Sequence, residues 1–246
     1  MKIYGIVGYP LGHSCSPSWF NERFREEGID AEYLPFEIRD IGRIVDIIAD
    51  YPDLRGFNVT IPHKQSVLPF LDEISDEARA VGAVNCVKVC RKEGRPCLTG
   101  YNTDVHGFRS ALLRFIPACI KKALILGNGG AAKAVRYALQ TLGIDSVTVS
   151  RTPKGRKEIG YPQVADYIGG FPLIVNATPL GTWPDTLSLP DIPYERLTPG
   201  HYLFDLVYNP ATTAFMANGS ASGAHVCNGY GMWLGQAEEN RRIWDI

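Results

Sequence analysis

The chain of 246 residues lacks several features that mark particular classes of protein. Its net charge is −1 and it has no block of like charges, which argues against a nucleic-acid-binding or membrane-surface protein. No apolar stretch is long enough to span a bilayer. Residues Met1–Gly5 have the pattern of a strand start rather than a signal peptide. We therefore expect a cytoplasmic protein without nucleic-acid or membrane partners. The sequence leaves open whether it is a monomer or a homodimer.

The six cysteines lack the spacing of a metal site or a redox motif. None forms a CxxC pair, and none stands at metal-ligand spacing from a histidine. We expect reduced thiols and no bound metal. Internal repeats and low-complexity tracts are also missing from the chain.

Alternating strand and helix patterns run along the whole chain, which is typical of an α/β protein. Three local features carry specific expectations. Ser16 is expected to cap a helix that has Pro17 in its first turn. Pro62 is expected to open another helix, and residues 153–170 are expected to be irregular because Gly and Pro interrupt them.

A glycine-rich turn follows the apolar run Leu124–Leu126 and precedes a helical pattern. This turn reads Gly127-Asn128-Gly129-Gly130-Ala131-Ala132, which is a GxGxxA pattern in the context that a dinucleotide site requires. Glycine lets the backbone approach phosphate, and the helix N-terminus offers amide N–H groups. We expect a Rossmann-like nucleotide domain over residues 105–228, and an open α/β domain formed by residues 1–104 plus 229–246.

The end of the next expected strand indicates which dinucleotide binds. NAD sites place an acid there, at the ribose 2′-hydroxyl. This chain has Ser150-Arg151-Thr152 instead, and Arg151 can pair with a 2′-phosphate. The sequence therefore favours NADP(H) over NAD(H). Lys154, Arg156 and Lys157 add positive charge nearby, although surface lysines of this kind are often only solvated.

Two later strands end in residues that suit the crevice of an open α/β sheet. Asn176 and Thr178 follow one of them. Val207 and Tyr208 follow the other, as core residues or as contacts on the nicotinamide side.

The first domain carries four polar segments, each of which alone is typical of helix caps and turns. Together with an NADP site they suggest a polyhydroxylated substrate. Reduction of a ketone also needs a proton donor, and a lysine oriented by a carboxylate can serve. Lys64 and Asp104 are the candidates, with His63 and His13 ranked below them.

These motifs resemble those of the shikimate dehydrogenase family in the same order along nearly the whole chain. They comprise Ser14-x-Ser16, Asn58-Val-Thr60-x-Pro-x-Lys64, Asn85, Asn102-Thr103-Asp104, the glycine turn, Ser150-Arg151-Thr152, Asn176-Ala-Thr178-Pro and Gly229-Tyr-Gly231-Met232-x-x-x-Gln236. The resemblance implies NADPH-dependent, reversible reduction of 3-dehydroshikimate to shikimate, a step of chorismate and aromatic amino-acid biosynthesis. It also implies a C-terminal helix that returns to the first domain.

The resemblance also implies roles for individual residues. Ser14 and Ser16 would hold the substrate carboxylate, Lys64 and Asp104 would form the catalytic pair, and Arg151 with Thr152 would contact the 2′-phosphate. The remaining substrate contacts would be Thr60, Asn85, Gln236 and Tyr208. The remaining cofactor contacts would be Gly127, Asn128, Gly129, Gly130, Ala131, Ser150, Asn176, Thr178, Val207, Gly229 and Met232.

Some positions depart from the family pattern. Asn128 stands where alanine is common, Cys86 where threonine is usual, and Cys15 between the two serines. The region after Arg151 is short, so the usual helix there is expected to be missing.

Two other functions remain as alternatives. A quinate/shikimate dehydrogenase of broader specificity would carry an acid after the cofactor strand and a threonine in place of Ser16. A non-enzymatic NADP-binding regulator on the same fold would most readily have lost Lys64 or Asp104, and both are present.

Overall fold

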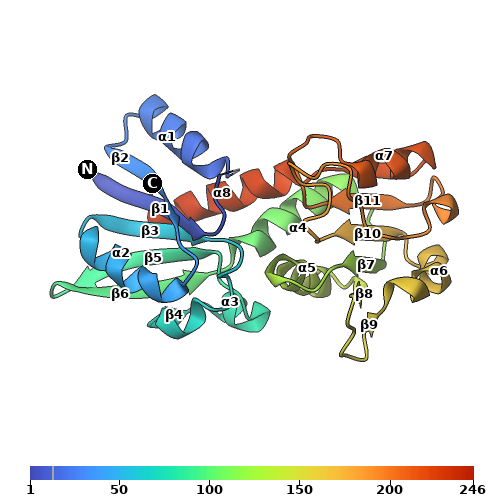
Figure 1. Ribbon diagram of the computed structural model, residues 1–246, viewed down its shortest axis with the longest axis horizontal. Helices are drawn as coiled ribbons and strands as arrows, with labels where there is room; N and C mark the ends of the chain where they lie inside the picture. Colours follow the sequence, from blue (N-terminus) through green and yellow to red (C-terminus); the bar gives the residue numbers. More distant parts are fainter. Residues whose placement is uncertain (13) are drawn as a thin grey trace. The chain divides into compact units, whose positions relative to one another are not determined.

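The computed structural model describes residues 1–12 and 14–246, so His13 lies outside the described residues. The chain forms two compact units (Figure 1). Unit 1 comprises Met1–Thr103 and Ala237–Ile246, and unit 2 comprises Asp104–Gln236. Each unit contains its own six-stranded sheet, so the expectation of an α/β protein is confirmed.

The sheet of unit 1 has the strand order β2-β1-β3-β5-β6-β4 (Figure 1). Its strands are β1 (Lys2–Gly8), β2 (Ala31–Glu37), β3 (Leu54–Val59), β4 (Glu73–Ile74), β5 (Cys86–Lys92) and β6 (Arg95–Tyr101). Strand β1 pairs in parallel with β2 and β3, whereas β5 is antiparallel to both β3 and β6. The strand β6 therefore runs in the same direction as β1 and β3.

Helices cover both faces of this sheet, because each face is apolar (Figure 1). The helical elements of unit 1 are α1 (Ser16–Glu26), η1 (Ile41–Arg43), α2 (Ile44–Asp50), η2 (Leu68–Phe70) and α3 (Asp76–Val81). On one face, Ile44 and Ile48 of α2 pack with Phe57. On the other, Phe20 of α1 stacks on Tyr33 with ring centroids 4.5 Å apart.

The same face is completed by the end of the chain. Trp244 of α8 (Tyr230–Trp244) lies 5.1 Å from the ring of Tyr4, centroid to centroid. Its indole Nε1 donates a hydrogen bond of 3.0 Å to the carbonyl oxygen of Val87. A Cβ atom on Gly56 would lie 2.3 Å from this nitrogen, so the indole fits only because position 56 is glycine. The second half of α8 is thus part of the core of unit 1.

Two local expectations for unit 1 are wrong. Cys15, not Ser16, is the N-cap of α1, and no side chain caps this helix. Residues 61–67 contain turns and no helix, and only the short η2 follows Pro62. His63 explains part of this, because its buried ring is hydrogen-bonded to the carbonyl oxygen of Ile38 at 2.8 Å and so holds the turn against the residue that follows β2. Helix α3 does have a side-chain cap, since the Ser75 hydroxyl accepts from the Ala78 N–H.

The sheet of unit 2 has the order β12-β11-β10-β7-β8-β9, and all its neighbouring strands are parallel (Figure 1). Its strands are β7 (Lys122–Leu126), β8 (Asp145–Val149), β9 (Glu158–Ile159), β10 (Leu173–Asn176), β11 (Tyr202–Asp205) and β12 (His225–Cys227). The order reverses at β7, which is the strand order of a Rossmann-like sheet. Ligands of such sheets bind at the carboxyl ends of the strands.

The helical elements named in unit 2 begin with α4 (Thr103–Phe115), whose first residue still belongs to unit 1. They continue with α5 (Gly130–Thr141), η3 (Tyr161–Gln163), α6 (Val164–Tyr167), η4 (Ile168–Gly170), η5 (Tyr194–Arg196), α7 (Ala214–Ala221) and the first half of α8. The expectation that residues 153–170 are irregular is wrong for the second half of the segment. There Ile159, Val164 and Ile168 are buried in the core. Their burial stabilises a short strand and short helices, which are too short to produce a periodic sequence pattern.

Candidate active site

The candidate substrate residues of unit 1 lie at one edge of its sheet. Strands β1, β3 and β6 end there, and the antiparallel strand β5 begins there. Ser14 and Ser16 follow β1, Thr60 and Lys64 follow β3, Asn85 precedes β5, and Thr103 follows β6. The fold therefore gathers residues that are far apart in the sequence at a single edge.

A buried chain of polar side chains connects Tyr33 with Asn85 behind this edge, and Ser16 lies next to Tyr33. The Ser16 hydroxyl favours the ionised form of the Tyr33 phenol and so opposes the effect of burial on its pKa. Tyr33 donates a hydrogen bond of 2.8 Å to Oδ1 of Asn58, and Nδ2 of Asn58 donates to the carbonyl oxygen of Asn85 at 3.0 Å. Burial raises the pKa of Tyr33 well above its usual value, so the hydroxyl stays a neutral donor.

Asn85 is fixed at the far end of this chain by Thr103. Its Oδ1 accepts from the Thr103 backbone N–H at 2.7 Å, and its Nδ2 donates to the Thr103 hydroxyl at 3.0 Å. The Thr103 hydroxyl in turn donates to Oδ1 of Asn240 in α8, at 2.7 Å. All three side chains are buried. The candidate substrate residue Asn85 is thereby held in one orientation.

Lys64 and Asp104, the candidate catalytic pair, belong to different units. The carbonyl oxygen of Lys64 accepts from the Val84 N–H at 2.8 Å, which fixes its backbone beside the start of β5. The Lys64 side chain is half-buried. Asp104 is buried and directly follows Thr103 in the chain.

In unit 2, the glycine turn follows β7 at the carboxyl edge of the sheet. Gly127 has a φ of +102°, a conformation that side chains disfavour, and a Cβ there would lie 3.0 Å from Cγ2 of Thr178. Helix α5 begins directly after Gly129 and presents its N-terminal amides at this edge. The turn therefore has the backbone that close approach of a phosphate requires.

The candidate 2′-phosphate residues follow the neighbouring strand β8. Arg151 and Thr152 are exposed, and the Thr152 N–H donates to the Ser150 hydroxyl at 3.2 Å. No acid ends β8, as the sequence indicated. Lys157 is paired with Asp145 at 2.6 Å, which supports its interpretation as a surface cation.

The residues that follow β10 and β11 are organised by one carboxylate, that of Asp205. It accepts hydrogen bonds from Nδ2 of Asn176 (2.9 Å), the backbone N–H of Val207 (3.0 Å) and the hydroxyl of Thr213 (2.6 Å). Oδ1 of Asn176 accepts from the hydroxyl of Thr178 at 2.6 Å. Burial raises the pKa of Asp205 to about 6, and the three hydrogen bonds oppose this shift.

The remaining candidates of unit 2 lie at the start of α8 or near it. A Cβ on Gly229 would lie 2.1 Å from the carbonyl oxygen of Leu206, so only glycine fits there. Met232 is buried, and the ring of Tyr208 lies 5.7 Å from that of Trp233, centroid to centroid. Gln236 is the last residue of unit 2.

Several side chains that organise these edges were not among the sequence candidates. They include Tyr33, Asp205 and Glu158, which accepts a hydrogen bond from Asn128 of the glycine turn. The signal for Asp205 was available, because an acid stands in the apolar run Tyr202–Val207. Tyr33 looks like any core aromatic residue of a strand, and Glu158 lies in the stretch expected to be irregular.

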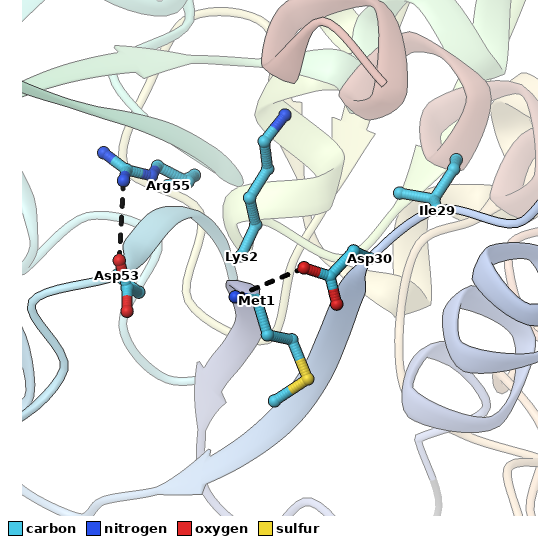
Figure 2. Close-up of a pocket in the computed structure, with 6 residues that line it drawn as sticks. All are labelled: Met1, Lys2, Ile29, Asp30, Asp53 and Arg55. Atoms are coloured by element: carbon cyan, nitrogen blue, oxygen red, sulfur yellow. Dashed lines mark ion pairs between the residues drawn. The ribbon is translucent and has the colours of Figure 1, made fainter.

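A separate cavity of about 290 Å³ lies at the opposite edge of the sheet of unit 1 (Figure 2). It is lined by Met1, Lys2, Ile29, Asp30, Asp53 and Arg55, at the amino ends of β1, β2 and β3. Four of its charged groups form ion pairs, Met1 with Asp30 at 3.3 Å and Arg55 with Asp53 at 3.5 Å. The cavity is therefore not an extension of the candidate substrate edge.

Metal and membrane features are not found in the part of the chain that the structure describes. Residues 1–12 and 14–246 contain no group of three or more His, Cys, Asp or Glu side chains placed to hold a metal ion. No helix among them is long and apolar enough to cross a membrane.

Known proteins are similar in sequence to this chain over nearly its full length. Residues 6–87 match the model of the shikimate dehydrogenase substrate binding domain. The shikimate dehydrogenase (NADP(+)) of Carboxydothermus hydrogenoformans is 36% identical, over 96% of this chain and 88% of the relative. That of Pyrococcus abyssi is 35% identical, over 99% of this chain and 92% of the relative.

The chain belongs to the shikimate dehydrogenase family.

Solved structures of shikimate dehydrogenases have the same fold. The enzyme of Thermus thermophilus in complex with NADP(H) and shikimate has a TM-score of 0.84 at 31% identity, covering 99% of this chain and 93% of that one. Another shikimate dehydrogenase, in complex with NADP+, has a TM-score of 0.86 at 30% identity, covering 99% of this chain and 90% of that one. The resemblance inferred from the motifs is thus confirmed.

The fold also occurs in a reductase of a different substrate. The 5-ketofructose reductase of a Gluconobacter strain has a TM-score of 0.80 at 28% identity, covering 99% of this chain and 92% of that one. The fold alone therefore does not determine which ketone a member of this structural group reduces.

Proposed function

We propose that this chain is an NADP(H)-dependent shikimate dehydrogenase, which reversibly reduces 3-dehydroshikimate to shikimate in chorismate and aromatic amino-acid biosynthesis. The observation that carries the proposal is the full-length similarity to enzymes of that name. The two edges of polar residues described above support it. We assign substrate binding to residues 1–104 plus 229–246 and cofactor binding to residues 105–228.

On the substrate side, the geometry supports recognition of a carboxylate and several hydroxyl groups. Ser14 and Ser16 offer two hydroxyl donors at the start of α1, where the helix dipole also favours an anion. Thr60, Asn85, Gln236 and Tyr208 supply further donors and acceptors for the ring hydroxyls. The buried chain through Tyr33 and Asn58 holds this array in place.

In the reduction, the hydride comes from bound NADPH. Lys64 donates the proton to the reacting oxygen, and in the reverse direction its neutral amine takes the proton back. Asp104 orients Lys64 and accepts a hydrogen bond from the neighbouring hydroxyl group. Thr103, fixed by Asn85 and Asn240, in turn restricts the backbone at Asp104.

The residues present fit an NADP cofactor. Gly127 leaves the backbone open to the pyrophosphate, together with Asn128, Gly129, Gly130 and Ala131. Arg151, with Ser150 and Thr152, presents an exposed guanidinium for the 2′-phosphate. The nicotinamide side is formed by Asn176, Thr178, Val207, Gly229 and Met232.

We further propose that the enzyme acts in the cytoplasm, as a monomer or a homodimer, without a nucleic-acid or membrane partner. All six cysteines are free thiols in the structure, which suits a reducing compartment.

Initial rates of nicotinamide reduction test the proposal when shikimate and quinate are each combined with NADP+ and NAD+. We expect activity with shikimate and NADP+. Comparable rates with quinate or NAD+ would instead identify an enzyme of broader specificity. Binding of NADPH without turnover of any combination would identify a regulator.

A further inference from the structure

Asn128, in the glycine turn, bridges two side chains of opposite charge. Nη2 of Arg136, on α5, donates a hydrogen bond of 2.8 Å to Oδ1 of Asn128. Nδ2 of Asn128 donates a hydrogen bond of 3.1 Å to Oε1 of Glu158, in β9. The three residues are close together although they come from a turn, a helix and a strand.

The chemistry of the two charged groups fixes how the amide lies. A guanidinium can only donate and a carboxylate can only accept, so the oxygen of Asn128 must face Arg136 and its nitrogen must face Glu158. An alanine at position 128, common in the family pattern, would leave these two groups unconnected. An aspartate would place a carboxylate against Glu158.

The other oxygen of Glu158 holds the segment 150–158, which carries the candidate 2′-phosphate residues. Oε2 of Glu158 accepts from the Lys154 N–H at 2.9 Å. The ends of the segment are fixed by the sheet, through the N–H groups of Thr148 and Ser150, which donate to the carbonyl oxygens of Lys157 and Ile159. Glu158 is thus the side chain that links the middle of this segment to the glycine turn.

We propose that Asn128, Glu158 and Arg136 are positioning residues that make the cofactor site selective for the 2′-phosphate. This inference rests on the proposed use of NADP(H). The bridge holds Arg151 at a fixed distance from the glycine turn, so that a ligand seated on the turn by its 5′-phosphate presents its 2′-phosphate to the guanidinium. Binding then requires less ordering of the segment.

The test compares two fragments of the cofactor by calorimetry, adenosine 2′,5′-bisphosphate and adenosine 5′-monophosphate. Both carry the 5′-phosphate, so the 2′-phosphate contribution is isolated by dividing the dissociation constant of adenosine 5′-monophosphate by that of adenosine 2′,5′-bisphosphate. This quotient is the ratio compared below.

Glu158→Gln places an amide nitrogen against another donor, either Nδ2 of Asn128 or the Lys154 N–H. Asn128→Asp places a carboxylate against that of Glu158. Each is expected to lower the ratio by about three- to tenfold. For Glu158→Gln, which lies outside the proposed cofactor contacts, kcat at saturating NADP+ should stay within about twofold of the unsubstituted enzyme.

The double variant Asn128→Asp with Glu158→Gln exchanges donor and acceptor. The carboxylate introduced at position 128 would accept from both Arg136 and the amide introduced at position 158, and the oxygen of that amide would still accept from Lys154. Size and net charge equal those of the unsubstituted chain. We expect the ratio to recover to within about twofold, because all three bonds are restored and only the bond between positions 128 and 158 changes direction.

Asp145→Asn is the matched control, since it neutralises an acid of the neighbouring strand and breaks an exposed ion pair. It should leave the ratio unchanged. Unchanged or higher ratios in the single variants, or a double variant no better than the poorer single one, would overturn the inference. A ratio of one in the unsubstituted protein would instead refute the use of NADP(H) itself, and the inference with it.

Discussion

The hydroxyl of Tyr33 donates a hydrogen bond of 2.8 Å to the amide oxygen of Asn58, inside the core of unit 1. Tyr33 lies next to Ser16 at the candidate carboxylate site, and Asn58 donates to the carbonyl oxygen of Asn85 at the candidate hydroxyl site. The two sites belong to different parts of the sequence, and the buried phenol of Tyr33 helps to fix their relative positions.

Tyr33→Phe should lower the free energy of unfolding by about 1–3 kcal/mol, because the oxygen of Asn58 loses its partner in a buried place. It should also raise the KM for shikimate while the KM for NADP+ stays constant. Denaturant unfolding and steady-state kinetics check both effects. A loss of stability without any change in the KM for shikimate would show that the bond serves the core alone.

Lys64→Ala should lower kcat by on the order of 10²–10⁴, because the proton donor is removed. NADPH should bind with an unchanged dissociation constant, measured by its fluorescence. His63→Gln provides a neighbouring comparison, since His63 is buried and hydrogen-bonded to Ile38 and should affect stability more than turnover. Turnover at the unsubstituted rate in Lys64→Ala would remove this residue from the mechanism.

The double variant Ser14→Ala with Ser16→Ala should raise the KM for shikimate by about tenfold or more, through the loss of two hydrogen bonds to a carboxylate. Its kcat should change less than its KM. If kcat fell while the KM stayed constant, the serines would not hold the substrate carboxylate.

Arg151→Ala should raise the KM for NADP+ by about 10- to 100-fold, because a charge-assisted bond to the 2′-phosphate is lost. The KM for NAD+ should be nearly unchanged. Lys157→Ala, which removes a cation already paired with Asp145, is the comparison for a general charge effect. Equal effects of Arg151→Ala on both cofactors would contradict the assignment.

Asp205 should make the stability of the protein depend on pH. Burial raises its pKa from 3.8 to about 6 in the folded state, so the folded state holds this proton more tightly than the unfolded one. Its contribution is therefore favourable below about pH 4 and is lost as the pH rises through about 6, by on the order of 3 kcal/mol.

Asp205→Asn should remove this dependence, because asparagine can accept from Asn176 and Val207 and donate to the Thr213 hydroxyl. Subtracting the melting temperatures of the two proteins between about pH 4 and 7 isolates the effect. A constant difference over this range would show that Asp205 does not titrate there.

Local patterns predicted much of the fold and the positions of the candidate residues. The glycine turn and the strand before it obey rules that a few adjacent residues express, and Gly127 has the positive φ that such a turn needs. Asp40 and Ser75 cap their helices for the same reason.

The errors arose where distant contacts outweigh local preference. Pro62 resembles the first residue of a helix, yet the bond of His63 to Ile38 holds a turn there. The strand β9 has two residues and exists through its pairing with β8. Tyr33 could not be assigned a polar role, since its partner Asn58 is 25 residues away and on another strand.

Helix α8 has a consequence for the order in which the chain folds during synthesis. Trp244 fills the space beside Gly56 and Tyr4, so the core of unit 1 stays incomplete until the residues after unit 2 have left the ribosome. Unit 2 is one continuous segment and can close its core earlier. The half of the protein that is made first is therefore the half that finishes folding last.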